Sequence, residues 1–182
     1  MDIVFRDSVT DEIEKREIYD ILNRCNDDFC PPLSQRADTS QKNLAPKTEN
    51  KDGVLNYCNA LLGQHTAVGI IDGRIMSFLS YKTDYTCDEL KKYGRVYYLT
   101  TLCVLPEFRR KGYSEELYKA VTDKIFAEDK SAVVSLRTWS TNGAQMYLMK
   151  KLGFSCETVL KDDRGRGIDT MYFVKTAPVK EE

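Results

Sequence analysis

The sequence has only one histidine, His65, and none of its cysteines forms a Cys-x-x-Cys pair. A zinc site needs several His or Cys ligands, and a Ser-His or Cys-His hydrolase needs a histidine beside its nucleophile. Neither kind of site is supported. We expect His65 to be a surface or strand-edge residue rather than a base. The six cysteines are expected to be small buried residues rather than a disulfide framework; they are Cys25, Cys30, Cys58, Cys87, Cys103 and Cys156.

An excess of one charge sign is also absent, because 27 basic and 28 acidic residues give a net charge of -1. Proteins that bind nucleic acid or an anionic membrane use a broad basic surface, so we expect neither partner. No apolar run approaches the roughly 20 residues that cross a bilayer, and residues 1–6 do not resemble a signal peptide. We therefore expect a cytoplasmic protein in which any phosphate is recognised by a local site.

Length and composition predict one domain over residues 1–182. A chain of 182 residues with 42% hydrophobic residues can close a single core of ordinary size. No repeat or low-complexity tract divides it. The oligomeric state stays open between a monomer and a homodimer.

Hydrophobic periodicity and turn residues predict alternating strands and helices. We expect strands at 3–5, 66–71, 74–81, 96–105, 132–137, 154–160 and 170–175, and helices at 11–26, 53–62, 115–127 and 142–152. The Asp72-Gly73 pair between two strand-like runs is typical of a β-hairpin turn. Residues 27–51, rich in Pro, Ser and Asn, predict a long connection. The fold class is α/β, a mixed sheet with helices on its faces.

The most informative stretch is 102–114, where Arg109, Arg110, Lys111 and Gly112 stand between a strand end and a helix start. Exposed amides and the positive end of a helix dipole attract anions, and a glycine lets the backbone approach the ligand closely. The segment therefore predicts a loop that binds a diphosphate. The alternative is a solvated basic turn before an ordinary helix.

This stretch resembles the acetyl-CoA signature of the GNAT superfamily of N-acetyltransferases, which reads L-x-V-x-P followed by [RQ]-x-x-G-x-[GA]. Arg109 and Gly112 match the second half, and Ser114 stands where Gly or Ala is usual. A serine there is a good N-cap residue, and its hydroxyl can bond a helix amide or a phosphate oxygen. Asn142, eleven residues before Gly153-Phe154, resembles a second pattern of the family, N-x(10)-G-F.

The resemblance implies a GNAT fold, a mixed, mostly antiparallel, twisted sheet of about six to seven strands flanked by about four helices. It also implies acetyl-CoA as co-substrate. Backbone groups of Leu102 and Val104 would bond the pantetheine, the amides of residues 109–114 the pyrophosphate, and Asn142 the cofactor's arm. The cofactor-binding residues it implies are Leu102, Cys103, Val104, Arg109, Arg110, Lys111, Gly112, Tyr113, Ser114 and Asn142.

Acetyl transfer to an amine needs a group that removes the amine's proton and an acid for the departing thiolate. The family commonly has Glu or Asp in the middle of the fourth strand as base, where this chain has Thr100 and Thr101. Their hydroxyls can orient a water but are poor bases. The family's tyrosine acid is replaced by Met149, and Tyr147 is a candidate roughly 200° away around the helix. Core packing is the other explanation of Tyr147.

The expected activity is transfer of an acetyl group from acetyl-CoA to a primary amine of a small molecule or peptide, by direct attack in a ternary complex. The missing acid and base keep open a non-catalytic acyl-CoA sensor or interaction module on the same fold. The loop with Asp27, Asp28, Phe29 and Arg36 is a candidate acceptor site, although acidic loop residues are commonly solvated surface. Cys103 alternates with buried strand positions, which favours packing over a nucleophilic role.

Overall fold

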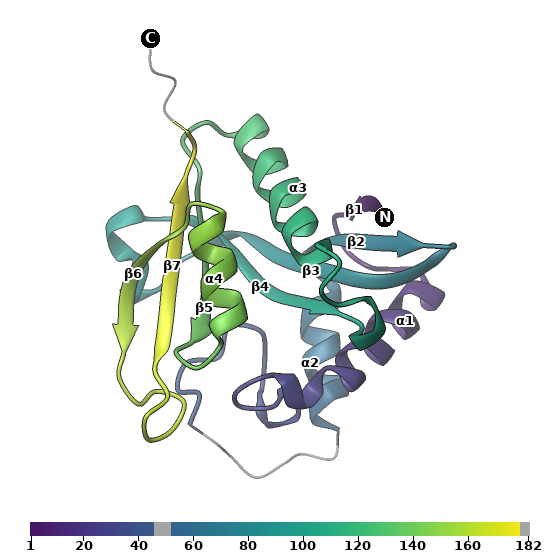
Figure 1. The fold of residues 1–182 in the computed structure, drawn as a ribbon, viewed down its shortest axis with the longest axis horizontal. Helices are drawn as coiled ribbons and strands as arrows, with labels where there is room; N and C mark the ends of the chain where they lie inside the picture. The colour runs from purple at the N-terminus through teal and green to yellow at the C-terminus, as the bar shows by residue number, and fades with distance from the viewer. Residues whose placement is uncertain (46–51, 179–182) are drawn as a thin grey trace.

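A computed structural model describes residues 1–45 and 52–178. The chain folds around one seven-stranded sheet in the order β1-β2-β3-β4-β5-β7-β6 (Figure 1). Neighbouring strands are antiparallel except for β4 and β5, which are parallel. The strands are β1 (Asp2–Arg6), β2 (His65–Ile71), β3 (Arg74–Tyr85), β4 (Val96–Val104), β5 (Val133–Trp139), β6 (Ser155–Leu160) and β7 (Thr170–Thr176). The expected mixed, mostly antiparallel sheet is confirmed.

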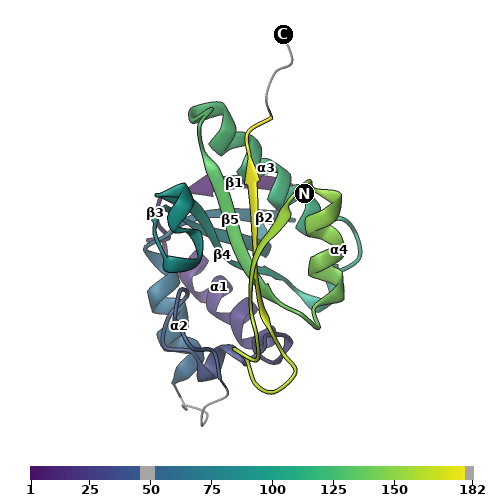
Figure 2. The ribbon, with the colours of Figure 1, turned by 90° about the vertical axis from the view of Figure 1, so that its left-hand side faces the viewer.

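Four α-helices in this part of the chain cover the two faces of the sheet (Figure 2). They are α1 (Glu12–Arg24), α2 (Gly53–Leu62), α3 (Tyr113–Glu128) and α4 (Gly143–Lys151). Side chains of α1 and α2 form one apolar cluster with β3 and β4, and those of α3 form a second with β4 and β5. The core therefore lies in two layers, one on each side of the sheet.

Helix α1 shows how local sequence sets these elements. The Asp11 carboxylate accepts hydrogen bonds from the amides of Ile13 and Glu14 at 2.9 and 3.0 Å, which caps the helix. Such a cap stabilises a helix by about 1 kcal/mol. The apolar face of α1 then buries residues at helical spacing, including Ile18 and Leu22.

Most predicted elements are confirmed within a few residues. Asp72 and Gly73 adopt φ values of 51° and 77°, as a tight hairpin turn requires. Two expectations need correction. Helix α3 begins at Tyr113 with Gly112 as N-cap, so Ser114 lies inside the first turn and is not the cap. The cysteines are all free, but only three are buried, and Cys156 is exposed.

The connection between α1 and α2 is irregular over residues 25–45, with short 3₁₀ turns at Asn26–Asp28 and Leu33–Gln35. The remainder of the predicted connection, residues 46–51, lies outside the described residues. The segment packs closely on α2, because a Cβ added at Gly53 would lie 2.0 Å from the Ser34 carbonyl oxygen. No helix in the described part of the chain is long and apolar enough to cross a membrane.

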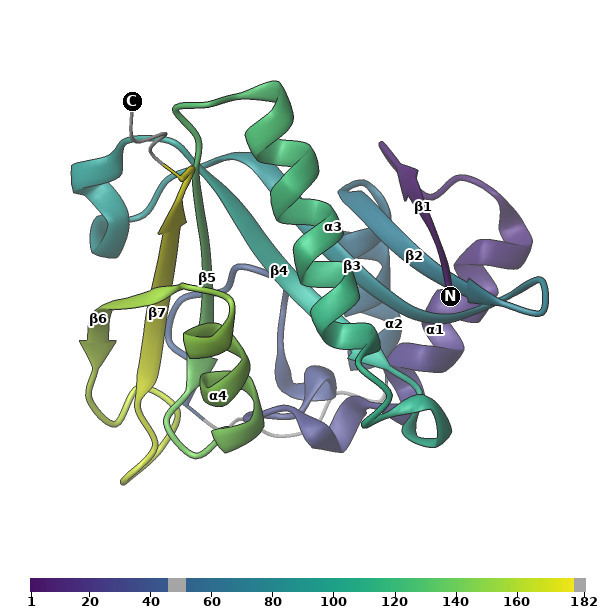
Figure 3. The ribbon, with the colours of Figure 1, turned by 45° about the horizontal axis from the view of Figure 1, so that its top comes forward.

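The sheet is opened between β4 and β5. These strands pair only from Tyr97 to Leu99 on β4, and then diverge so that β4 follows β3 while β5 follows β7 (Figure 3). The divergence begins at a bulge, because Ser80 and Tyr81 pair with Thr101 and Leu99 and leave Thr100 as an extra residue. Bulges are frequent beside active sites, where they redirect a strand.

Candidate functional site

The opened edge of β4 presents backbone groups that have no strand partner. The Leu105 amide donates to the Met76 carbonyl at 3.0 Å. Because bonded and non-bonded residues alternate in an antiparallel ladder, the backbone groups of Leu105 and Cys103 face β3. Those of Leu102 and Val104 face the opening, where β5 no longer pairs with β4. Position and spacing agree with the two residues that the sequence pattern indicates.

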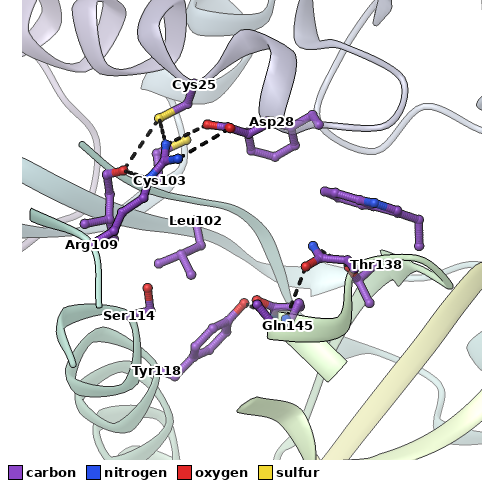
Figure 4. A pocket seen from close by; sticks show the side chains of 14 residues that line it. Cys25, Asp28, Leu102, Cys103, Arg109, Ser114, Tyr118, Thr138 and Gln145 are labelled. Carbon is purple, nitrogen blue, oxygen red and sulfur yellow. Dashed lines mark hydrogen bonds and ion pairs between the residues drawn. The ribbon is translucent and has the colours of Figure 1, made fainter. Parts of the chain in front are cut away.

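A cavity of about 420 Å³ fills this opening (Figure 4). Its walls come from β4, the end of β5, the first turns of α3 and α4, and the residues just after α1. A second cavity of about 200 Å³ continues between the start of α3 and α4. The two share four lining residues, Val104, Arg109, Ser114 and Ala144, so they form one path from the opened sheet to the α3 N-terminus.

The start of α3 has the geometry of an anion site. Gly112 has φ 88°, a conformation that other residues rarely adopt, and no side chain caps the helix. The first backbone amides of the helix therefore lack intrahelical partners and point outward with the positive end of the dipole. The exposed side chains of Arg110 and Lys111 add two positive charges that form no ion pair within the described chain.

Arg109 has a different role from its two neighbours. Its guanidinium donates to Asp28 at 2.6 Å, and its Nε donates to the Val104 carbonyl at 3.0 Å. Figure 4 shows the side chain turned toward Cys25 and Asp28 and away from the α3 start. Arg109 therefore joins the end of β4 to the residues after α1, and its charge is already paired. This orientation depends on a residue 81 positions away in sequence, which explains why the motif did not reveal it.

Two thiols, those of Cys25 and Cys103, line the same wall of the larger cavity. A hydrogen bond from Cys103, with the nearby Arg109 charge, lowers the pKa of the Cys25 thiol from its ordinary value. Burial instead raises the pKa of the Cys103 thiol. Cys103 is 3% exposed within the core cluster, in agreement with the expected packing role.

On the opposite wall, Asn142 and Ser114 mark the starts of α4 and α3. The Asn142 Oδ1 accepts from the Gln145 amide at 3.2 Å and caps α4, and its Nδ2 donates to Thr138 at 3.2 Å. Gly153 ends α4, and the amide of the next residue bonds the Met149 carbonyl at 2.9 Å. The helix predicted over 142–152 is confirmed as α4, with Asn142 as its N-cap.

Tyr118 is a cavity residue that the sequence motifs did not indicate. It lies one turn after Ser114 on α3, and its ring packs against Phe154 with centroids 6.4 Å apart. The hydroxyl accepts a hydrogen bond from Gln145 Nε2 at 2.6 Å, which leaves its own proton available to the cavity. Burial raises the pKa of Tyr118, with Gln145 partly opposing, so the hydroxyl stays protonated at neutral pH. The signal available in the sequence was the spacing of Ser114 and Tyr118, which as i and i+4 residues lie on the same face of α3.

The family follows from comparison with known proteins. A model described as the acetyltransferase (GNAT) family matches residues 16–154. The chain belongs to the GNAT family. No curated protein shows a significant sequence match to it.

Solved structures share the GNAT fold of this chain at low sequence identity. The structure of yncA from Salmonella typhimurium with its cofactor acetyl-CoA has a TM-score of 0.64 and 19% identity, over 100% of this chain and 98% of that one. Arabidopsis thaliana NAA60 in complex with a bisubstrate analogue has a TM-score of 0.63 and 20% identity, over 96% and 97%. An N-acetyltransferase from Staphylococcus aureus Mu50 has a TM-score of 0.64 and 14% identity, over 97% and 99%.

GNAT enzymes use acetyl-CoA, and the opened edge, the two cavities and the uncapped α3 start fit such a long, phosphate-bearing molecule. The residues that the sequence assigned to acetyl-CoA come from the end of β4, the loop before α3, and the starts of α3 and α4. Leu102, Cys103, Val104, Arg109, Ser114 and Asn142 line the larger cavity, and Arg110, Gly112 and Tyr113 line the smaller one. Lys111 lines neither, and its ammonium lies 5.1 Å from the centroid of Phe108.

The threonines that stand at the usual GNAT base position do not line either cavity. The Thr101 hydroxyl shares a 2.7 Å hydrogen bond with the buried Tyr57, and that of Thr100 donates to Gln64 at 2.7 Å. Tyr147 is 70% exposed, so the core-packing explanation of it is wrong. Its side chain borders the smaller cavity, at the α3 start, and not the opened sheet.

Proposed function

We propose that this GNAT protein transfers the acetyl group of acetyl-CoA to a primary amine of a small molecule or peptide, by direct attack in a ternary complex. The observation that carries the proposal is the unpaired edge of β4 at Leu102 and Val104, which opens on a cavity leading to the α3 start. Two structural neighbours support amine acylation, since they are named as N-acetyltransferases from Staphylococcus aureus and, for ribosomal protein S18 alanine, from Escherichia coli.

Acetyl-CoA supplies the acetyl group in activated form, as a thioester. The Leu102 amide and carbonyl and the Val104 amide would hold its pantetheine, because they lack partners within the described chain. The Val104 carbonyl is unavailable for this, since it already accepts from Arg109 and from the Cys25 thiol at 3.0 and 3.7 Å. The amides at the start of α3, with Arg110, would hold the pyrophosphate.

The cavity determines how protons move during transfer. Among the described residues that line it, Asp28 is the one carboxylate, and both of its oxygens already accept hydrogen bonds from Arg109. The attacking amine is therefore taken up in its neutral form or loses its proton to water. The Tyr118 hydroxyl donates a hydrogen bond to the thiolate sulfur as the carbon–sulfur bond breaks and the carbon–nitrogen bond forms.

The test is amine-dependent release of free thiol from acetyl-CoA, across small amines, amino acids, aminoglycosides and peptides with free N-termini. The key variant is Gly112→Trp, which places a large side chain in the smaller cavity. Gly73→Trp is its matched control, since Gly73 has φ 77° and open space around it in the β2–β3 turn. We expect amine-dependent release by wild type and Gly73→Trp, and its loss in Gly112→Trp.

Calorimetric titration of coenzyme A separates the alternatives. Binding that Gly112→Trp abolishes, with no turnover of any amine, would favour an acyl-CoA sensor over an enzyme. No binding to the wild type would contradict the proposed cofactor site altogether.

A further inference from the structure

Three arginines lie close to one another beside the opened part of the sheet, and none has a negative partner among residues 1–45 and 52–178. Arg137 projects from β5, Arg164 from the loop between β6 and β7, and Arg36 from the connection after α1. None of them forms an ion pair with any residue that the structure describes. Asp163, the acidic neighbour of Arg164, accepts a hydrogen bond from Thr170 instead.

The hydrogen bonds that this arginine cluster (Arg36, Arg137 and Arg164) donates to described residues all go to neutral oxygens. The Cys30 carbonyl accepts from both Arg36 and Arg164, so these two guanidinium groups lie close together. Arg137 donates to the Gln41 carbonyl at 2.6 Å and to the Tyr172 hydroxyl at 3.4 Å. Arg36 also shares a side-chain hydrogen bond with Tyr57, whereas Arg164 Nη2 donates to no described residue.

Two of the three arginines are also buried, and Arg137 is partly buried, which makes unpaired charge costly. Arg36 is 9% exposed and Arg164 is 2% exposed. Burial lowers the pKa of both guanidinium groups. Repulsion from Arg137 lowers both further, although Tyr57 partly opposes the effect at Arg36. Buried charges in proteins are normally paired with an opposite charge, so this arrangement favours the binding of an external anion.

The cluster lies directly behind the wall of the larger cavity. The Arg36 guanidinium lies 5.2 Å from the centroid of the Phe29 ring, and that of Arg164 lies 5.4 Å from the Trp139 ring. These two rings have centroids 6.1 Å apart, and both line the cavity. The two rings therefore stand between the cavity and the guanidinium groups, and a carboxylate reaches the cluster from the acetyl site by displacing them.

We propose that the acceptor is an amine that carries a carboxylate, as an amino acid does, and that the arginine cluster binds this carboxylate. The inference rests on the proposed acetyl transfer and names its acceptor class. Arginine presents a planar fork of donors that matches the two oxygens of a carboxylate. The carboxylate would neutralise the cluster and hold the amine of the same molecule toward the opened edge of β4.

Trp139 provides a direct readout, because it is the chain's one tryptophan and borders both the cavity and Arg164. The probes are N-acetylated amino acids of each side-chain class, each paired with its neutral amide, and N-acetylphosphoethanolamine. We expect saturable changes in Trp139 fluorescence with at least one carboxylate probe and binding about tenfold or more weaker with its amide. Equal binding of acid and amide in every pair, or binding of the phosphate probe alone, would overturn the assignment.

The variants are Arg137→Gln and Arg137→Lys, with Arg166→Gln as matched control, since Arg166 is exposed on the same loop as Arg164. We expect Arg137→Gln to weaken binding of the carboxylate probe about tenfold or more and to leave coenzyme A binding unchanged. Arg137→Lys should keep part of the affinity for the probe. Unchanged affinity in Arg137→Gln would count against the site.

Turnover separates this inference from the proposed function. Carboxylate binding without transfer to any amine would overturn the enzyme and leave the anion site. Transfer to neutral amines with kcat/KM equal to that of the matching amino acids would leave the enzyme and overturn the anion site.

Discussion

Single side chains in the cavity owe their chemistry to neighbours from distant parts of the chain. Tyr118 and Gln145 are 27 positions apart. Their 2.6 Å hydrogen bond occupies the tyrosine oxygen as acceptor and leaves the hydroxyl proton free. Tyr147, the candidate that the sequence offers two residues before the family's tyrosine position, is exposed. Sequence alone could not rank these two tyrosines, because the difference lies in how α3 and α4 meet.

Replacement of Tyr118 by Phe tests this ranking. The ring and its packing on Phe154 are kept, and only the hydroxyl is lost. We expect kcat to fall about 10- to 100-fold, with little change in KM for acetyl-CoA, because the hydroxyl acts on the departing sulfur. Tyr19→Phe on α1 is the control. A larger fall in Tyr147→Phe than in Tyr118→Phe would reverse the assignment.

Tyr81 gives a prediction for stability at alkaline pH. Burial first, and then the charges of Glu128 and Asp7, raise its pKa to about 12, and its side chain is buried in β3. An unfolded tyrosine loses its proton near pH 10, so between pH 10 and 12 the unfolded state binds fewer protons than the folded state. The stabilisation is therefore complete below pH 10 and is lost as pH rises through 12.

The measurement is urea unfolding of the wild type and Tyr81→Phe at pH 8 and pH 11. The wild type should lose on the order of 1 kcal/mol more than the variant between the two pH values. An equal loss in both proteins would mean that Tyr81 ionises alike in the folded and unfolded states.

At the level of elements, local sequence predicts what local interactions determine. The β2–β3 hairpin follows from Asp72-Gly73, and α2 follows from the periodicity of residues 53–62. The separation of β4 from β5 is not a local property, because β5 lies beside β4 for three residues and then pairs with β7 along its length. The motif correctly located the loop before α3, but not the inward turn of Arg109.

The link between α1 and the end of β4 yields a paired comparison. Arg109–Asp28 and Arg24–Glu107 both join the end of α1 to the segment after β4, with distances of 2.6 and 2.8 Å, but Arg109 and Asp28 line the larger cavity. All four side chains are more than a third exposed, so solvent screens both ion pairs and each contributes little to stability.

We expect Arg109→Met to raise KM for acetyl-CoA about three- to tenfold, because the Val104 carbonyl and the loop lose their anchor. Arg24→Met should lose as much stability as Arg109→Met, but its KM for acetyl-CoA should not change. Steady-state kinetics and urea unfolding of the two variants provide the comparison. Equal KM values would show that Arg109 is a structural residue only.

At the scale of the whole molecule, two layers of helices hold one sheet that is opened along a single seam. The first four strands, β1 to β4, and α1, α2 and α3 build one side of the seam, and β5, β6, β7 and α4 build the other (Figure 3). Composition and periodicity predicted the layers and most strands. The acceptor side was harder to predict, because Arg36, Arg137 and Arg164 are more than 120 positions apart at their extremes and meet only in the folded chain.

The most direct test of this account is a crystal structure of the protein with coenzyme A bound. We predict that the pantetheine lies between β4 and β5 and bonds the backbone of Leu102 and Val104, with the pyrophosphate on the first amides of α3. Coenzyme A bound elsewhere, or β4 and β5 paired along their full length in the complex, would contradict it.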